Sequence, residues 1–526
     1  MHTPKRFLAD SLITSGTQYP EKIAVVVEGQ PYSYASLLDQ ARRLANALLA
    51  RGLQRGDRVA IYMDNTWPCI VSVYAVTLAG GAFLVINPQT KADKLAYILN
   101  DSEAGILLTD LHLKNVITEA APECNTLQRL ICSGKENTLA QDLATLTQPV
   151  EFFDEVIASS EALTVPAHIT PVDLAALVYT SGSTGNPKGV MHTHLSMTFA
   201  LHSLIEYLRL NHDHVLLNML PFAFDYGLYQ LLMAVELGAT LVLERSFTYP
   251  AQIFKRMQEY QVSVFPGVPT IFSMLLAAHA RAPLSFPSVQ RVTNTAAALP
   301  ADYVPRLKEI FPNALIYKMY GLTECKRVCY LEPELVDTHA SSVGKAIPGT
   351  EVFLLDAEGQ AVPPGERGIL HVRGPHIMLG YWKQPELSAH MLKPGRLPHE
   401  RVLCTHDWFH MDKDGFLYFV GRSDDIIKTR GEKVSPIEVE NVLHSIDGVL
   451  EAAVIGQPDE LLGEKICAFV TLAPNSKLTD KEIRKICLSR LENFMAPQEV
   501  TVLDSLPKTA TGKVSKKLLK EQYQRP

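Results

Sequence analysis

The stretch from 174 to 190 reads Leu-Ala-Ala-Leu-Val-Tyr-Thr-Ser-Gly-Ser-Thr-Gly-Asn-Pro-Lys-Gly-Val. Its first six residues form an apolar run that predicts a buried β-strand. A loop rich in hydroxyl groups and glycine follows, and its candidate phosphate-binding residues are Thr180, Ser181, Gly182, Ser183, Thr184, Gly185 and Lys188. Hydroxyl donors, a backbone that a ligand can approach closely and a mobile cation together suit a polyphosphate. The loop departs from the usual P-loop, because Pro187 stands where that pattern has a glycine before its lysine. A plain surface loop is the alternative interpretation.

Strand and helix patterns alternate on both sides of this loop. Apolar runs predict strands at 23–27, 59–63, 105–109 and 240–243, and one-sided apolar spacing predicts a helix from about 35 to 51. Such alternation favours parallel sheets that are covered on both faces. After about residue 340 the pattern changes to short strands at 351–355, 368–372 and 415–420. We predict an α/β fold with a large N-terminal domain, residues 1–422, of covered and mostly parallel sheets plus a small β-barrel-like part. A small mobile α+β C-terminal domain, residues 423–526, follows.

Composition excludes several classes of protein. Of the 526 residues, 47% are hydrophobic and 20% are charged, which excludes a disordered chain. The net charge of −7 argues against nucleic-acid binding. The eight cysteines are scattered without a CxxC pair, which fits a reducing cytosol and predicts a cytoplasmic location. The N-terminus lacks the apolar region of a signal peptide, and the apolar stretch 70–88 is interrupted, so we expect a helix, a turn and a strand there and no membrane insertion.

Four further motifs follow the phosphate loop in a fixed order. They are Tyr320-Gly321-Leu322-Thr323-Glu324, Thr405-His406-Asp407, the segment 421–434 that begins Gly421-Arg422-Ser423-Asp424-Asp425, and Pro507-Lys508-Thr509-Ala510-Thr511-Gly512-Lys513. With the loop, they resemble the adenylate-forming superfamily, which includes acyl-CoA synthetases, amino-acid adenylation domains and firefly-type luciferases. The resemblance covers essentially the whole chain.

The resemblance implies a role for each matched residue. Tyr320 would stack on adenine with Gly321 beside it, Thr323 would hold the α-phosphate, and Glu324 would face Mg²⁺. Asp407 and Arg422 would bind the ribose. His406 replaces the glycine usual between Thr405 and Asp407, which puts the local backbone geometry in question, and we interpret it as a surface histidine. Asp424 would be a hinge and Lys513 the catalytic lysine. The stretch Leu379-Gly380-Tyr381-Trp382 also fits the family, as a structural turn.

The implied reaction has two halves. A small carboxylic acid attacks Mg·ATP to give an acyl-adenylate and pyrophosphate, and a phosphopantetheine thiol, on CoA or on a separate carrier protein, then displaces AMP. Rotation of the small domain about Asp424 would switch the enzyme from the arrangement that forms the adenylate to the arrangement that admits the thiol.

The acid is indicated by the residues around Asp225. Many acyl-CoA synthetases carry histidine at the position of Phe224, whereas amino-acid adenylating relatives carry Phe-Asp, in which the aspartate binds the substrate amino group. Phe224, Asp225 and Tyr229 would line the pocket, and no Lys or Arg lies between 209 and 245 to pair with Asp225 locally. We therefore favour an amino or imino acid. Asp225 is equally well placed to cap the helix that follows it.

Other functions remain open on the sequence. A fatty or aryl acyl-CoA synthetase is the first alternative. A phosphotransferase or ATPase, a luciferase-like oxygenase and a non-catalytic nucleotide-binding relative are the others.

Overall fold

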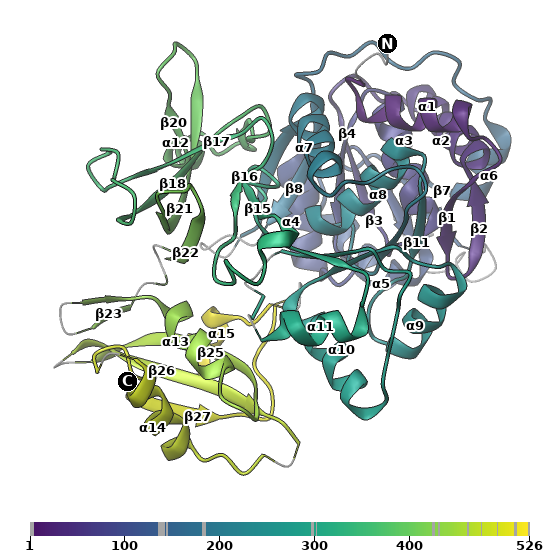
Figure 1. Cartoon of the computed structure of the whole chain (residues 1–526). Coiled ribbons are helices and arrows are strands. Elements are labelled where there is room, and N and C mark those ends of the chain that lie inside the picture. The colour runs from purple at the N-terminus through teal and green to yellow at the C-terminus, as the bar shows by residue number, and fades with distance from the viewer. Residues whose placement is uncertain are drawn as a thin grey trace.

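The computed structural model describes residues 5–523 apart from 135–142, 144–145, 181–185, 296–298, 301, 423–424, 426, 430–431, 460–461, 475, 492 and 510–512. Within this part of the chain, four sheets and their covering helices form a large and a small body (Figure 1).

Two large sheets, parallel in their centres, form the main body, as predicted. The nine-stranded sheet has, in spatial order, β16 (Lys345–Ala346), β15 (Cys329–Leu331), β14 (Leu315–Tyr320), β13 (Arg291–Asn294), β12 (Val264–Gly267), β10 (Val215–Asn218), β11 (Thr240–Leu243), β1 (Ile23–Val27) and β2 (Gln30–Ser33). The eight-stranded sheet has β19 (Gly380–Tyr381), β9 (Lys188–Thr193), β8 (Leu174–Thr180), β4 (Ala82–Ile86), β3 (Arg58–Tyr62), β5 (Ile106–Asp110), β6 (Arg129–Ser133) and β7 (Val150–Phe152). Antiparallel pairs occur only towards the ends of the two sheets.

The helices of the main body lie between and outside these sheets. They are α1 (Leu8–Gln18), α2 (Tyr34–Ala50), α3 (Trp67–Leu78), α4 (Ala92–Ser102), α5 (Lys114–Ala120), α6 (Phe153–Ser159), α7 (His194–Tyr207), α8 (Asp225–Leu237), α9 (Pro250–Glu259), α10 (Pro269–Arg281), α11 (Tyr303–Ile310) and α12 (Pro385–Met391). The prediction for 35–51 is confirmed by α2, whose N-cap Ser33 accepts a hydrogen bond from the Ser36 amide. The apolar stretch 70–88 contains α3 and β4, as expected.

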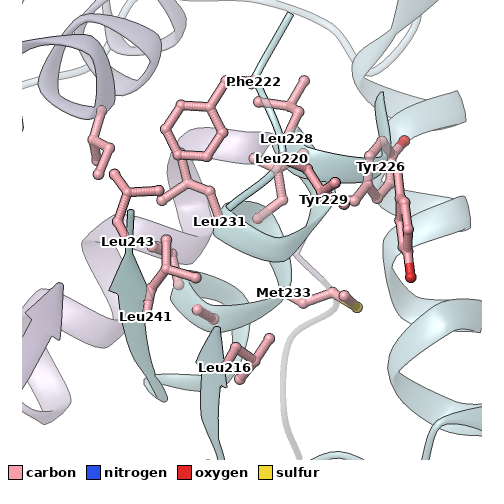
Figure 2. Close-up of a cluster of buried hydrophobic side chains, with 14 of the residues drawn as sticks. Leu216, Leu220, Phe222, Tyr226, Leu228, Tyr229, Leu231, Met233, Leu241 and Leu243 are labelled. Carbon is pink, nitrogen blue, oxygen red and sulfur yellow. The ribbon is translucent and has the colours of Figure 1, made fainter. Parts of the chain in front are cut away.

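Helix α8 is central to the core, because nearly all of its residues are buried. Figure 2 shows Leu228, Leu231 and Met233 of this helix among the leucines of β10 and β11, while Tyr226 and Tyr229 lie to one side of that cluster. The first turn of α8 lies so close to the preceding chain that a Cβ on Gly227 would come within 2.5 Å of the Leu220 and Pro221 carbonyl oxygens. This packing fixes the position of Asp225 at the start of the helix.

The predicted barrel-like part is a separate five-stranded antiparallel sheet. Its strands are β17 (Glu351–Leu355), β18 (Arg367–Arg373), β21 (Arg401–Met411), β20 (Leu392–Pro394) and β22 (Leu417–Arg422). Among the described strands the pairing runs from β17 to β20, with β22 paired to β21, and does not close into a barrel.

The C-terminal body contains the fourth sheet, which is mixed but mostly antiparallel. Its strands are β24 (Glu432–Val434), β23 (Ile427–Thr429), β26 (Gly463–Leu472), β25 (Val449–Asp459) and β27 (Glu499–Val502), and its helices are α13 (Pro436–His444), α14 (Asp480–Arg490) and α15 (Lys516–Tyr523). It contacts the five-stranded antiparallel sheet through an ion pair of 3.1 Å between Arg367, in β18, and Glu438. No helix in the described residues is long and apolar enough to span a membrane.

Candidate active site

Strands β8 and β9 flank the phosphate loop in the sequence and pair antiparallel with each other. Thr180, the last residue of β8, is paired with Lys188, the first residue of β9. The connecting residues Ser181, Gly182, Ser183, Thr184 and Gly185 lie outside the described part of the chain. Thr180 is half-buried, and its buried hydroxyl makes no hydrogen bond within the described part of the chain. The pairing therefore brings a hydroxyl donor and an ammonium group to the same end of the eight-stranded sheet.

The ammonium group of Lys188 lies beside Glu324. Its Nζ donates to the hydroxyl of Tyr381 over 2.9 Å and lies 3.8 Å from the Oε1 atom of Glu324. Tyr381 in turn donates to the same Oε1 atom over 2.5 Å. Desolvation lowers the pKa of Lys188, and the charge of Glu324 opposes that shift. The interpretation of Tyr381 as part of a structural turn is thus incomplete, because its hydroxyl joins two residues of the candidate site.

Tyr320, Asp407 and Arg422 also come together, although they are up to 102 residues apart in the sequence. The antiparallel register of β21 and β22 places Asp407 opposite Arg422, and the Arg422 Nε atom lies 3.3 Å from the Asp407 Oδ1 atom. Tyr320 ends β14 and donates its hydroxyl to the Oδ2 atom of Asp407 over 2.5 Å. Its ring packs edge-on against Phe409, with ring centroids 4.9 Å apart. The resemblance had assigned these three residues to one nucleoside site, and the fold gathers them in one place.

His406 itself adopts the backbone conformation that a glycine would take at this position. Its backbone has a φ of 57°, in the left-handed region that glycine adopts at little cost. The pairing of β18 and β21 is irregular here, because Ile369 and His371 face Trp408 and Cys404. The His406 ring is half-buried and stacks on His390, with centroids 4.3 Å apart, so it is not the surface histidine that we expected.

The segment after Tyr320 folds back on itself. Gly321 lies so close to the next turn that a Cβ would overlap the carbonyl oxygen of Lys326. Thr323 is held through its carbonyl oxygen, which accepts a hydrogen bond of 2.9 Å from His192 Nε2. Burial lowers the pKa of His192. Glu324 is buried. The turn therefore presents Glu324 towards Lys188 and carries Lys326 into the interior.

Asp225 has a partner that the sequence did not reveal. The Nζ atom of Lys326, 101 residues further along the chain, lies 3.6 Å from the Asp225 Oδ2 atom. The Lys326 side chain is 3% exposed and lies over the ring of Tyr229, with 4.5 Å from Nζ to the ring centroid. Burial lowers the pKa of Lys326 to about 7, although the carboxylate of Asp225 partly offsets this shift. The sequence offered Asp225 no cation nearby along the chain, and the structure supplies one from a distant segment.

The other predicted pocket residues lie on the same helix. Helix α8 begins at Asp225, and its N-cap residue is Phe224, so Asp225 is not the N-cap that the sequence suggested as an alternative. It occupies the first turn, where a carboxylate interacts favourably with the helix dipole. Phe224 is half-buried, and Tyr229 is buried.

Arg327, next to Lys326, was missed by the sequence reasoning altogether. Its side chain is 1% exposed and its Nη1 atom donates to the hydroxyl of Thr295. The available signal was two adjacent cations one residue after the Thr323-Glu324 motif, inside the otherwise apolar segment from 325 to 331.

Lys513 reaches this site from the C-terminal body. An antiparallel bridge joins Lys508 to Val514, and the Thr509 amide donates a hydrogen bond of 2.7 Å to the Lys513 carbonyl, which holds Lys513 beside the chain that precedes it. The Lys513 side chain keeps access to solvent, but the surrounding protein desolvates it, which lowers its pKa. The carboxylates of Asp225 and Asp407 oppose that shift, so both lie within electrostatic reach of the ammonium group. The predicted hinge, Asp424, lies outside the described residues.

Among the described residues, two places can offer oxygen ligands to a metal ion. Asp64, Asp110 and His112 place one ligand atom each within 4.8 Å of one another at the ends of β3 and β5, but Arg245 lies 3.6 Å from Asp64 and competes with a metal for it. The second place that offers an oxygen ligand is Glu324. Its described hydrogen bond and ion pair both use Oε1, which leaves Oε2 to face a hard cation such as Mg²⁺. The donor chemistry at Glu324 thus fits the expected ion.

Comparison with known proteins places these features in a family. The family model described as AMP-binding enzyme matches residues 13–382, and the model described as AMP-binding enzyme C-terminal domain matches residues 438–513. A long-chain-fatty-acid–CoA ligase of Bacillus subtilis (strain 168) is 31% identical over 99% of this chain and 95% of its own length. An oxalate–CoA ligase of Arabidopsis thaliana is 30% identical over 96% of both chains.

Solved structures agree with the sequence comparison. The anthranilate CoA ligase AuaEII in complex with anthranoyl-AMP superposes with a TM-score of 0.89 at 25% identity, covering 99% of this chain and 98% of that one. The resemblance inferred from the five motifs is confirmed. The chain belongs to the AMP-binding enzyme family within the adenylate-forming superfamily, and it is an AMP-forming ligase that adenylates carboxylic acids.

Proposed function

We propose that this ligase forms an acyl-adenylate between Asp225 and Asp407 and then passes the acyl group to a phosphopantetheine thiol, on CoA or on a separate carrier protein. The observation that supports this most is the position of Lys513. It comes from the C-terminal body, yet its ammonium group interacts with the carboxylate beside the acid pocket and with the carboxylate beside Tyr320. A cation between these two places would lie where the acid and the α-phosphate meet.

In the first half-reaction, an oxygen of the acid attacks the α-phosphorus of ATP. The bond between the α-phosphorus and the α,β-bridging oxygen breaks, and pyrophosphate leaves with the electron pair of that bond. No protein nucleophile is needed, so the protein acts by positioning and by stabilising negative charge. Lys513 would neutralise charge between the two anions, and Thr323 would hold an oxygen of the α-phosphate.

The remaining residues would bind the nucleotide. The ring of Tyr320 would stack on adenine beside Gly321, and Asp407 with Arg422 would bind the ribose hydroxyls. The β- and γ-phosphates would lie on the loop that includes Thr180, Ser181, Gly182, Ser183, Thr184, Gly185 and Lys188. Glu324 would hold Mg²⁺, which supplies positive charge to the phosphate oxygens. Lys188 would then leave Glu324 for a phosphate oxygen, which its flexible side chain allows.

The second half-reaction requires a thiol to approach the acyl carbon. We place the domain boundary between 422 and 423 and the hinge at Asp424, so that rotation of residues 423–526 withdraws Lys513 and opens a path for the thiol. The eight cysteines are all buried free thiols, which fits the cytoplasmic location that we expect for this ATP-using enzyme.

Two classes of acid compete for the pocket. The Phe224-Asp225 pair favours an amino or imino acid, whose ammonium group would bind Asp225. Against this, Lys326 already places an ammonium group 3.6 Å from that carboxylate. A substrate amine would have to displace Lys326 into a buried position without a carboxylate, which is costly. The ion pair therefore favours an acid without an amino group, and the amino or imino acid is the second candidate. The relatives do not decide between them, because they include CoA ligases for fatty acids and oxalate and also a subunit of linear gramicidin synthase.

The test is acid-dependent exchange of labelled pyrophosphate into ATP, with amino acids, imino acids and their deaminated counterparts of equal length. We expect the deaminated acids to support faster exchange of pyrophosphate into ATP than the amino and imino acids do. Once a thiol is added, AMP should be the nucleotide product. Asp225→Asn separates the two candidates further, since it should raise KM selectively for amino acids if Asp225 binds their ammonium group. Formation of ADP and phosphate would refute the proposed reaction.

A further inference from the structure

The acid pocket carries more positive than negative charge. Behind Asp225 lie two buried cations, Lys326 at 3% and Arg327 at 1% exposure, against one carboxylate. The two nearby histidines do not change this balance, because burial lowers the pKa of His192 and lowers that of His376 to about 4, so both are neutral at physiological pH. The interior of the pocket thus holds two basic side chains against one carboxylate.

Arg327 has no anionic partner among the residues that the structure describes. Among the described residues, no carboxylate lies within 4.0 Å of its nitrogens, and its Nε atom makes no hydrogen bond. It lines a cavity of about 10 Å³ together with Lys326, Tyr229 and Gln230, whose Oε1 atom is also unpaired. An uncompensated guanidinium in the interior is costly, so its presence calls for a partner.

The backbone at this point is also strained. Lys326 has a φ of 61°, in the left-handed region that is unfavourable for residues with a Cβ. Such strain is characteristic of positions where side-chain placement serves a ligand. In this turn the Lys326 side chain points towards Asp225, and the side chain of the next residue, Arg327, lines the cavity.

We propose that the acid activated by this enzyme is a short dicarboxylic acid, whose second carboxylate binds Arg327 and Lys326 at the inner end of the pocket. This inference rests on the proposed ligase function and specifies its substrate class. The cavity has room for about one oxygen-sized group, so it can take one oxygen of that carboxylate. Lys513 and Lys326 both interact with Asp225, so the two carboxylates would lie on either side of this one side chain, which suits a short acid. A fatty tail would instead bury its methylene groups against two charges. The carboxylate near Lys513 reacts, and the second one only binds.

The test uses the full-length protein with Mg²⁺ and ATP, and measures acid-dependent pyrophosphate exchange with acids of equal carbon number. The pairs are malonate and propionate, succinate and butyrate, and glutarate and valerate. We expect one dicarboxylate to exceed its monocarboxylate counterpart at least tenfold in kcat/KM. This comparison needs no variant, so it stands even if a substitution prevents folding.

Variants then test the two cations. Arg327→Met should lower kcat/KM for the dicarboxylate at least tenfold, mainly through KM, and leave the monocarboxylate unchanged or improved. Arg327→Lys should restore part of the preference, and Lys326→Met should reduce it. The matched control is Arg209→Met, which removes an exposed arginine paired with Glu332 and Glu334 and should leave the preference unchanged.

Each other outcome overturns the inference. If monocarboxylates or amino acids are preferred, or if none of the dicarboxylates supports exchange, the substrate class is wrong while the ligase reaction can still stand. If the dicarboxylate preference survives both Arg327→Met and Lys326→Met, the two cations are structural only. Failure of the proposed function itself would be seen separately, as ADP among the products.

Discussion

The buried ammonium group of Lys326 should make the stability of this enzyme depend on pH. The perturbation is Lys326→Met, which keeps the length of the side chain and removes its charge. In the folded state the pKa of Lys326 is lowered from 10.5 to about 7, chiefly by burial. The unfolded chain therefore holds this proton up to a higher pH than the folded chain does.

The sign of the effect follows from this difference in proton binding. Below pH 7 both states carry the proton, and the full cost of burying the charge opposes folding. As the pH rises from 7 towards 10.5, the folded state releases the proton first and that cost disappears. Stability relative to the variant should thus rise with pH, by about 2.5 kcal/mol between pH 6 and pH 9.

The assay is thermal unfolding of the ligand-free wild type and variant across this pH range. For a domain of about 400 residues, that free energy corresponds to a change of roughly 3 °C in the difference between the two Tm values. Lys308→Met is the matched control, because it removes an exposed lysine that pairs with Asp337 at the surface. A difference between wild type and Lys326→Met that stays constant, or shrinks, from pH 6 to pH 9 would refute the reasoning.

Three further predictions concern the reaction. Lys513→Ala should slow pyrophosphate exchange by about 100-fold or more, because it removes a cation where two anions meet, and it should spare thioester formation from a supplied acyl-adenylate. Asp424→Pro should do the reverse, since proline fixes φ at the predicted hinge, and equal losses in both half-reactions for both variants would contradict domain rotation. Asp407→Asn should raise the KM for ATP about tenfold, because the Tyr320 hydroxyl and Arg422 lose a charged partner, and isothermal titration with ATP should show the same loss of affinity.

The sequence predicted the elements of the fold and the nucleoside site well, for a physical reason. Strand and helix periodicity depends on local sequence, and the motifs that carry Tyr320, Asp407 and Arg422 could each be recognised as contiguous segments. Their convergence was then implied by the resemblance, and the structure brings all three within hydrogen-bonding or ion-pair distance.

The acid pocket was predicted less well, because its decisive contact is between distant segments. Nothing near Asp225 in the sequence indicates that a lysine 101 positions later neutralises it. The left-handed backbone at His406 was a question raised by the sequence, and only the structure shows that the histidine adopts the glycine-like conformation itself. The role of Tyr381 could not be predicted either. It depends on a hydrogen bond from the Tyr381 hydroxyl to Glu324, which belongs to a different sequence motif.

The close approach of Gly321 to the Lys326 carbonyl has a consequence for altering substrate scope. Any side chain at 321 would displace the turn that carries Lys326 and Arg327. A substitution beside the proposed adenine site would therefore also change which acid the enzyme prefers. Conversely, a loop graft that replaces Lys326 and Arg327 alone would shift the backbone under Tyr320. Residues 320–327 should therefore be exchanged between family members as one cassette, and libraries that vary the acid pocket residue by residue should hold Gly321 constant.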